Sequence, residues 1–356
     1  MAVLLSLSII PIIFSGFFNN YNNKQKKIYL MLCALFMIVV MGLRGRFVGS
    51  DDTNNYCKIF EIAVEQTNLK KFLTIRGVYN SNLIFSEIGF YGFVWGIGRV
   101  FNHYQFLLIL SSLIMIICTI IFIKNNSDDC MLSIVMYITL GLFTFCMNGM
   151  RQGIAMSICL IAFDFAKNKK FIPFLITVLF AMLFHKSAIF YLIVYFLFLF
   201  KPKFSHIMFF WGLLSLFIIF SNNLISIFDY VVGKDYADSE NVESGGIVTV
   251  LIYLLVIIFT LITIKDLKNN NIIFTLLLIS IIGLVTYLFR YFSIHIIERL
   301  SYYFFYSIII LLPSAINKFN CKERMLIKII TITVCLLLFA YRLNGSLFEE
   351  YYFLQK

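Results

Sequence analysis

Long apolar runs separated by short lysine-rich connections dominate this sequence. A helix needs about 20 apolar residues to cross a bilayer, and about twelve runs approach that length. Of the 356 residues, 61% are hydrophobic and 13% are charged, about half the charged fraction of a soluble domain. We therefore expect an all-α polytopic protein, with one integral membrane domain over residues 1–356. The expected spans are 2–18, 28–43, 105–123, 131–147, 150–166, 171–185, 187–200, 204–220, 247–264, 272–289, 302–316 and 326–341.

The eight cysteines exclude a secreted fold held together by disulfides. They form no CxxC pair, and most of them lie inside apolar runs. We expect them to behave as small core hydrophobes. The first apolar run lacks a basic N-terminal region and a small-residue cleavage site, which predicts a retained helix.

Positive charge in short connections predicts the orientation of the spans. With the spans above, the lysine clusters all fall on one side, which we assign to the cytoplasm. For all lysine clusters to fall on one side, two segments need a particular assignment. Residues 83–101 are predicted to form a helix on the outer face that does not span. The stretch 171–200 is split at His185, Lys186 and Ser187 into two arms of about 15 residues, roughly 22 Å each. A polar tip below the outer surface predicts a water-accessible cavity. The larger outer loops are 44–104 and 221–246.

The two kinds of basic residue separate by side. Fourteen lysines and one arginine are predicted on the cytoplasmic side, and eight arginines and six lysines on the outer side. The net charge of +11 therefore has an explanation in topology, and no nucleic-acid partner is expected. Arginine carries a planar donor fork that grips phosphate bidentately. Contact with lipid headgroups is the alternative for any single arginine. The arginines predicted to bind a diphosphate are Arg44, Arg46, Arg151, Arg290 and Arg299.

The segment 44–56 combines two arginines, glycines and the adjacent carboxylates Asp51 and Asp52. One interpretation is a capped loop in which Asp52 or Thr53 starts a short helix. The other is that the carboxylates orient an acceptor sugar, assist a base or bind a cation, although two adjacent Asp residues are a weak metal signal.

Two further positions suggest chemistry on the outer face. Arg151 begins the run 150–166, where a helix N-terminus adds backbone N–H groups to the guanidinium and favours an anion. His185 lies at the predicted recessed tip, where neutral imidazole could take a proton from a sugar hydroxyl. A solvated helix start and a satisfied interface histidine are the respective alternatives.

The segment 290–299 offers either a second phosphate clamp or an internal salt bridge. In a helix, His295 would share a face with Arg299 and would neighbour Glu298. No nucleotide-binding loop, HExxH or GxSxG motif is present. Asp164 is the one ionisable residue well inside an apolar run, which is thin support for a proton-relay transporter.

Taken together, these motifs resemble the EpsG-like family of Wzy-type bacterial polysaccharide polymerases, which make O-antigen, capsule or exopolysaccharide. The match covers about residues 40–305, and the motifs are specific only in combination. Ser50, the additional Asp51 and Ile88 depart from the family pattern, and Asp52 is taken as the equivalent carboxylate because Thr53 and Tyr56 then align. The matching positions are Arg44, Val48–Tyr56, Glu87–Phe90, Asn148–Ala155, Phe184–Ala188 and Glu298–Tyr302.

The resemblance implies a GT-C-like membrane glycosyltransferase of the bacterial cytoplasmic membrane, with its active site facing outward. Its substrates would be undecaprenyl-diphosphate-linked repeat units, with bilayer lipids around it and a flippase and chain-length regulator as candidate partners. No cofactor and no metal are expected, because arginines would replace a cation at the leaving diphosphate. His185 or Asp52 would act as the base. The rival functions are a translocase of polyprenol-linked glycans, another GT-C-type transferase and an O-antigen ligase. The expected substrate-binding residues are Gln152, Tyr56, Asp51, Glu87, His295 and Glu298.

Overall fold

The structure is a computed structural model. It describes residues 1–16, 23–76, 87–200, 203, 205, 208, 209, 212, 246–264, 270–292, 295–344, 346 and 348–353. The side chains of Asp51 and of residues 291–297 lie outside this description. So do nearly all of the predicted span 204–220 and of the predicted outer loop 221–246. These expectations stay predictions.

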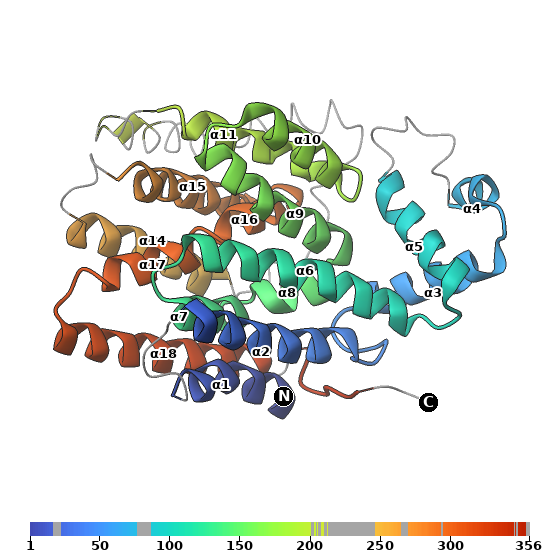
Figure 1. The fold of residues 1–356 in the computed structure, drawn as a ribbon, viewed down its shortest axis with the longest axis horizontal. Helices are drawn as coiled ribbons and strands as arrows, with labels where there is room; N and C mark the ends of the chain where they lie inside the picture. The colour runs from blue at the N-terminus through green and yellow to red at the C-terminus, as the bar shows by residue number, and fades with distance from the viewer. Residues whose placement is uncertain are drawn as a thin grey trace. The chain divides into compact units, whose positions relative to one another are not determined.

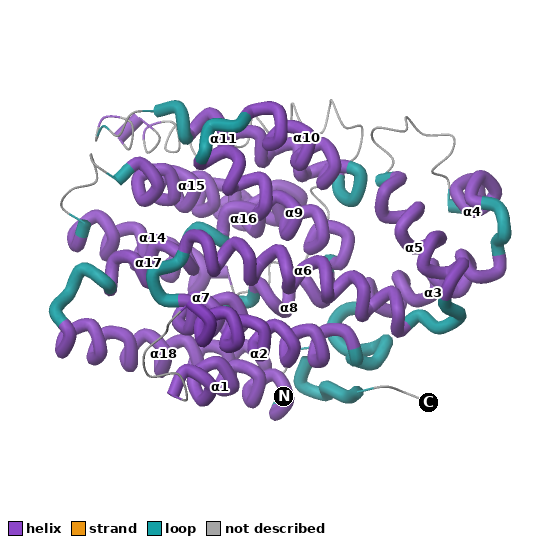
Figure 2. Tube along the Cα trace, in the orientation of Figure 1, coloured by secondary structure: helices purple, strands orange, loops and turns teal. Residues whose placement is uncertain are grey.

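Contacts divide the chain into two compact units. The first comprises residues 1–192 and 325–356, and the second comprises residues 193–324. Over the described residues, all regular elements are helical (Figure 2), apart from an isolated antiparallel bridge between Arg44 and Phe353.

The first unit contains most of the helices (Figure 1). Its elements are α1 (Ala2–Gly16), α2 (Asn23–Gly42), α3 (Asp51–Glu65), α4 (Leu69–Ile75), α5 (Ile88–Val100), α6 (Gln105–Asn126), α7 (Cys130–Thr139), α8 (Leu142–Asn148), α9 (Met150–Lys167), α10 (Phe171–Met182), the 3₁₀ helix η2 (Lys186–Leu192) and most of α18 (Cys321–Leu343). The second unit holds α11 (Ile193–Leu197), α14 (Gly246–Thr263), α15 (Asn271–Leu288), the 3₁₀ helix η4 (Phe289–Phe292), α16 (His295–Phe305) and α17 (Ile308–Ile316).

The core of the first unit forms around α9, which packs against α6 and α10. Helix α9 is buried along most of its length because small residues allow its neighbours to approach closely. At Gly153, an added Cβ would lie 2.8 Å from the Met115 sulfur of α6 and 3.2 Å from the Cα of Cys146 in α8. The buried hydroxyl of Ser157 donates to the Gly153 carbonyl 2.8 Å away, so it needs no partner on another helix.

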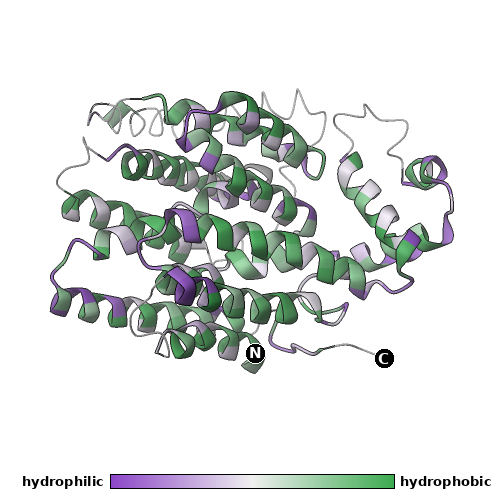
Figure 3. Ribbon diagram, in the orientation of Figure 1, coloured by the Kyte–Doolittle hydropathy of each residue, from purple (hydrophilic) through white to green (hydrophobic). Residues whose placement is uncertain are grey.

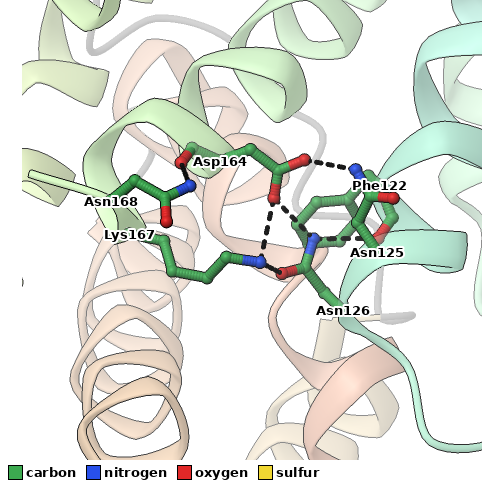
Figure 4. Close-up of polar contacts among 6 residues, drawn as sticks. All are labelled: Phe122, Asn125, Asn126, Asp164, Lys167 and Asn168. Carbon is green, nitrogen blue, oxygen red and sulfur yellow. Dashed lines mark hydrogen bonds and ion pairs between the residues drawn. The ribbon is translucent and has the colours of Figure 1, made fainter. Parts of the chain in front are cut away.

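A polar cluster ties the C-terminal ends of α6 and α9 together (Figure 4). Asp164 accepts hydrogen bonds from Asn125 at 2.6 Å and from Asn126 at 3.1 Å, and Lys167 lies 3.2 Å from the same carboxylate. Lys167 also donates to the Asn126 side chain at 2.7 Å. The ionisable residue that was noted inside the run 150–166 is therefore part of a paired cluster at a helix end.

The described helices identify a multi-pass membrane protein. Five are long and apolar enough to cross a bilayer, namely α2, α6, α14, α15 and α18, and there are seven spans if two bent pairs each form one span. The bent pairs are α7 with α8, at 49°, and residues 298–305 with α17, at 41°. Shorter apolar helices cover 2–16, 171–182 and 186–197. Apolar colour follows α6 and α15, and hydrophilic residues gather near helix ends and connections (Figure 3). The count of about twelve spans stays a prediction.

Two predicted features that position the site are confirmed. The chain breaks between α10 and η2, so that His185 lies between two short apolar elements. Residues 88–100 form α5, whose 13 residues extend roughly 20 Å and are too short to cross the bilayer.

Helices α3, α4 and α5 form a group within the predicted outer loop 44–104 (Figure 1). Arg99 of α5 donates to the carbonyls of Ala63 and Val64 at 2.6 Å, which satisfies two groups at the end of α3. Trp95 donates to the Gln66 carbonyl at 2.9 Å. The short helix expected from the Asp pair exists, and Ser50 occupies its N-cap position instead of Asp52 or Thr53.

In the second unit, α14, α15 and α17 pack together, and α15 also packs on α16. The hydroxyls of Ser280 and Ser307 pair at 2.6 Å in its core, and the Tyr253 hydroxyl donates to the Ser301 carbonyl at 3.3 Å.

All eight cysteines of the chain are free, and six of them are buried, as expected of core residues.

Candidate active site

The loop that follows α2 docks on the junction between α8 and α9, which brings two of the sequence motifs together. The Ser50 N–H donates to the side-chain oxygen of Asn148 at 3.0 Å, and the Thr53 hydroxyl donates to the Met147 carbonyl at 3.4 Å. Gly49 has φ +93°, and a Cβ there would lie only 2.2 Å from the Asn148 oxygen. Glycine is required for both reasons. These contacts fix the loop 44–50 against Met147 and Asn148, just before the first turn of α9, which carries Arg151.

Arg44 is fully buried in this loop and supports the backbone. Its guanidinium donates to the carbonyl of Met41 and, at 2.8 Å, to that of Met147. Burial lowers the pKa of Arg44 to about 10. The adjacent Gly45 N–H donates to the Tyr352 carbonyl at 3.0 Å, so the C-terminal segment covers this loop. The guanidinium of Arg44 holds α2 and α8 together and is not presented to solvent.

Arg46 is engaged by side chains of the outer loop. It donates to the Asn54 oxygen at 2.9 Å and pairs with Glu61 at 3.0 Å. Its guanidinium also lies 5.3 Å from the ring centre of Tyr104. Because its side chain is 22% exposed, some of the guanidinium still reaches solvent.

Three residues from distant parts of the sequence meet at Glu87. The Nη1 of Arg151, in the first turn of α9, donates to Oε2 of Glu87 at 2.5 Å. The Nδ1 of His185, just before η2, lies 2.5 Å from Oε1 of the same carboxylate. The Glu87 side chain is 9% exposed, that of His185 is 27% exposed and that of Arg151 is 36% exposed. A buried carboxylate therefore joins two side chains that remain open to solvent.

The electrostatics of this cluster keep Glu87 ionised. Burial alone would raise its pKa, but the hydrogen bond and charge of His185, the charge of Arg151 and the Lys186 main-chain N–H together hold the pKa below its ordinary value. An ionised carboxylate can only accept hydrogen bonds. Here it accepts from three donors, which belong to α9, to His185 and to the first residue of η2.

Tyr56 extends the cluster toward α3. The Arg151 guanidinium carbon lies 5.9 Å from the centre of the Tyr56 ring, and that ring packs edge-on against Phe90 at 5.4 Å. Burial raises the pKa of Tyr56, and the negative charge of Asp52 adds to this effect. Asp52 itself is exposed in the first turn of α3. Gln152, beside Arg151, is 4% exposed and faces the core.

The remaining predicted site residues belong to the second unit. Arg290 donates to Oε1 of Glu298 at 2.7 Å, and both side chains are largely buried. This pair supports the salt-bridge interpretation of the segment 290–299. Arg299 is exposed, and the side chain of His295 lies outside the described residues.

The order and spacing of these motifs can now be compared with known families. The EpsG family matches residues 27–354, nearly the whole chain. The chain belongs to the EpsG family. EpsG-like proteins are Wzy-type polymerases, so this EpsG-family chain has a polysaccharide polymerase role and is a membrane glycosyltransferase in the general sense. Comparison with curated proteins and with solved structures gives no match.

The sequence grouped Glu87 with the substrate-binding residues of the EpsG-family chain and missed its central place. The local signals were the motif Glu87–Phe90 and, within it, Gly89, whose N–H donates to the Leu183 carbonyl at 2.9 Å. Over the described part of the chain, no three His, Cys, Asp or Glu residues come together as a metal site. The Asp51 side chain is not among the described residues, so the metal alternative for the Asp pair is decided by experiment.

Proposed function

We propose that this EpsG-family chain polymerises polysaccharide repeat units on the outer face of the bacterial cytoplasmic membrane. It would transfer a growing glycan from undecaprenyl diphosphate to a sugar hydroxyl of a second lipid-linked repeat unit. One observation carries the proposal: Arg151 and His185, a phosphate-binding side chain and a proton acceptor, share the carboxylate of Glu87. Both side chains remain partly exposed, so a substrate can reach them.

Arg151 is the proposed ligand of the leaving diphosphate. A guanidinium has five N–H donors, and Glu87 takes one at Nη1, which leaves the exposed part of the group for phosphate oxygens. The positive end of α9 adds to this attraction, because Arg151 lies in the first turn of that 18-residue helix. Both contributions grow as negative charge develops on the leaving oxygen, which lowers the barrier. Arg290 and Arg299 are further candidate phosphate ligands.

His185 is the proposed proton acceptor, and Asp52 is the second candidate. In the transfer step, the acceptor O–H bond breaks as the oxygen forms a bond to the anomeric carbon of the donor sugar. The bond from that carbon to the diphosphate oxygen breaks, and its electron pair leaves with the diphosphate. The proton passes to the imidazole and then to water, so that atoms and charges balance without a cofactor.

The rival function as a translocase finds less support. A proton-coupled transporter needs ionisable residues along its pathway through the bilayer. Asp164, the candidate noted in the sequence, is held by two asparagines and a lysine at the ends of α6 and α9 (Figure 4). There it links the C-terminal ends of α6 and α9.

Purified protein in lipid nanodiscs, supplied with undecaprenyl-diphosphate-linked repeat units, should give a ladder of polymer and release undecaprenyl diphosphate. Arg151→Lys and His185→Ala should each reduce the rate by about 10²–10³, the range measured for loss of one group that stabilises a transition state. Matched controls are Arg324→Lys and His103→Ala, which make the same substitutions outside the cluster and should keep the ladder. Wild-type ladders from both site variants would refute the assignment.

The same assay separates the rival functions. A ligase would attach one finished glycan to an acceptor and give no ladder. A translocase would move the lipid-linked glycan across proteoliposomes without forming a glycosidic bond. A transferase that uses polyprenyl-phosphate sugars would release the monophosphate.

A further inference from the structure

Glu87 accepts more hydrogen bonds than a simple ion pair would need, and the proposed transfer step gives it no task. Its carboxylate receives Nη1 of Arg151 and Nδ1 of His185, each at 2.5 Å, and the main-chain N–H of Lys186. By contrast, Glu61 pairs with Arg46 at 3.0 Å while 49% exposed. Because three donors already occupy a buried Glu87, this group is poorly suited to bind a sugar or to take a proton itself.

The backbone around Glu87 is fixed to the segment that carries His185. Glu87 has φ 55°, a left-handed conformation that is costly for a residue other than glycine. Gly89 N–H donates to the Leu183 carbonyl at 2.9 Å, and the Phe90 N–H points at the same oxygen at 3.4 Å. A strained conformation persists only where its surroundings hold it, and such residues cluster at functional sites.

We infer that Glu87 is the positioning residue of the reaction: it holds His185 in the tautomer that carries hydrogen on Nδ1, so that Nε2 faces the acceptor hydroxyl. The same carboxylate orients Arg151 for the diphosphate. This inference rests on the proposed function for its kinetic consequence, and on the distances around Glu87 for its structural part.

The tautomer follows from the charge of the carboxylate. An ionised carboxylate offers lone pairs only, so the hydrogen between it and His185 must sit on Nδ1. In a neutral imidazole, the lone pair is then on Nε2, where it can accept a proton. When Nε2 takes the proton, the imidazolium forms beside the buried negative charge of Glu87, which stabilises it. An Asp that orients a catalytic His in this way is worth about 10⁴ in kcat in serine proteases.

The groups that face Glu87 come from each element packed against it. Arg151 comes from α9, His185 comes from the residue before η2, and the Lys186 N–H comes from the start of η2. Tyr56 of α3 lies beyond Arg151. No other carboxylate among the described residues is hydrogen-bonded to His185. Glu87 is therefore the group that sets the tautomer.

The test combines nitrogen NMR with steady-state kinetics on full-length protein in nanodiscs. With ¹⁵N-labelled histidine, the chain gives only four imidazoles, and the His185→Gln variant identifies the signal of His185. At pH 8.5, about two units above the ordinary imidazole pKa, wild type should show hydrogen on Nδ1 and none on Nε2. Glu87→Gln should show a mixed or reversed tautomer, because the amide can also donate to Nδ1.

In the kinetic assay, Glu87→Gln should lower kcat by about 10²–10⁴ and leave KM for the acceptor within about threefold. Glu87→Asp, which keeps the charge on a shorter side chain, should restore part of kcat. The matched control is Asp129→Asn, which removes a carboxylate paired with Lys328 at 2.5 Å while keeping an oxygen to cap α7. It should leave tautomer and kcat unchanged.

Hydrogen on Nε2 in wild type would overturn the inference, and so would a wild-type kcat in Glu87→Gln. If wild type forms no polymer, the proposed function fails, but the tautomer measurement still decides whether Glu87 positions His185. If Glu87→Gln does not fold, the wild-type tautomer and Glu87→Asp still provide the decision.

Discussion

Gly89 offers the sharpest test of how the site is built, because its close approach to α10 holds Glu87 beside His185. A Cβ at residue 89 would lie 2.7 Å from the Leu183 Cβ and 3.0 Å from the Leu183 carbonyl carbon and oxygen. Non-bonded carbon atoms prefer about 3.5–4.0 Å, so Gly89→Ala must push the start of α5 away by roughly 0.5–1 Å. The contact partly involves main-chain atoms, which cannot rotate away.

The expected cost combines two effects. Overpacking costs about 1–3 kcal/mol, and weakening the Gly89 hydrogen bond to Leu183 costs about 1 kcal/mol more. Replacing glycine in a helix returns at most about 1 kcal/mol. The net loss of about 1–3 kcal/mol corresponds to a fall in the unfolding midpoint of about 1–4 °C for a chain of this length. Because a misplacement of about 1 Å at a reacting group can cost about 10²-fold, kcat should fall by about tenfold to a hundredfold.

The same helix provides matched controls. Gly92 and Gly96 also lie in α5, and a Cβ at either position would meet nothing within 4 Å. Gly92→Ala and Gly96→Ala should therefore raise stability by about 0.4–1 kcal/mol and leave kcat unchanged. A thiol-reactive dye can follow unfolding, because six of the eight free cysteines are buried. The exposed Cys321 is changed to serine in every variant to remove its background.

Two results would refute this reasoning. If Gly89→Ala were as stable as Gly92→Ala, the close approach of α5 to α10 would not exist in the protein. If Gly89→Ala lost stability but kept its kcat, the contact would serve the fold alone, and Glu87 would reach His185 without it.

Three further predictions concern pH, metal and the buried arginine. The pKa of Glu87 lies below its ordinary 4.5, so the ionised carboxylate stabilises the fold above that pH. This stabilisation is lost as the pH falls through the folded-state pKa. Unfolding midpoints measured against pH should therefore fall more steeply for wild type than for Glu87→Gln. EDTA should leave polymerisation unchanged, whereas a loss restored by Mg²⁺ would make Asp51 and Asp52 a metal site. Arg44→Lys should destabilise the fold by about 2–5 kcal/mol, since one ammonium cannot reproduce two guanidinium bonds to separate carbonyls. The KM for lipid-linked substrate should stay constant in the folded fraction. A raised KM would mean that Arg44 contacts phosphate.

Much of the helical framework could be predicted because apolar runs follow directly from the cost of placing polar groups in a bilayer. The break near His185 is confirmed, and a short helix covers residues 88–100 of the predicted non-spanning helix 83–101, whose placement on the outer face stays a prediction. The bend of 49° between α7 and α8 was not predicted, since residues 131–147 look like one continuous run. Its cause is Gly141, which adopts φ +96° and ends α7. Hydropathy averages over such a residue and cannot detect it.

The site was predictable in its residues but not in its connections. Arg151, His185 and Glu87 were all named from the sequence, yet their pairing spans 64 and 98 residues. Spacing along the chain predicts contacts only within one helix, where residues three or four apart meet. The segment 290–299 illustrates the point, because among its described side chains Arg290 pairs with Glu298, eight residues away.

The arginine excess on the predicted outer side also changes meaning once partners are known. A count of charges treats every guanidinium as an equal ligand for phosphate, but the donors that bond protein carbonyls are not available to phosphate. Arg44 satisfies two backbone carbonyls, Arg99 satisfies two more at the end of α3, and Arg342 donates to the Leu140 carbonyl at 3.0 Å. These residues stabilise loops and helix ends where lysine, with one ammonium, could reach fewer acceptors. Arg151 differs in that its partners are the side chains of Glu87 and Tyr56, and 36% of its own side chain is exposed. We therefore expect the replacement of Arg151 by lysine to affect catalysis more than stability.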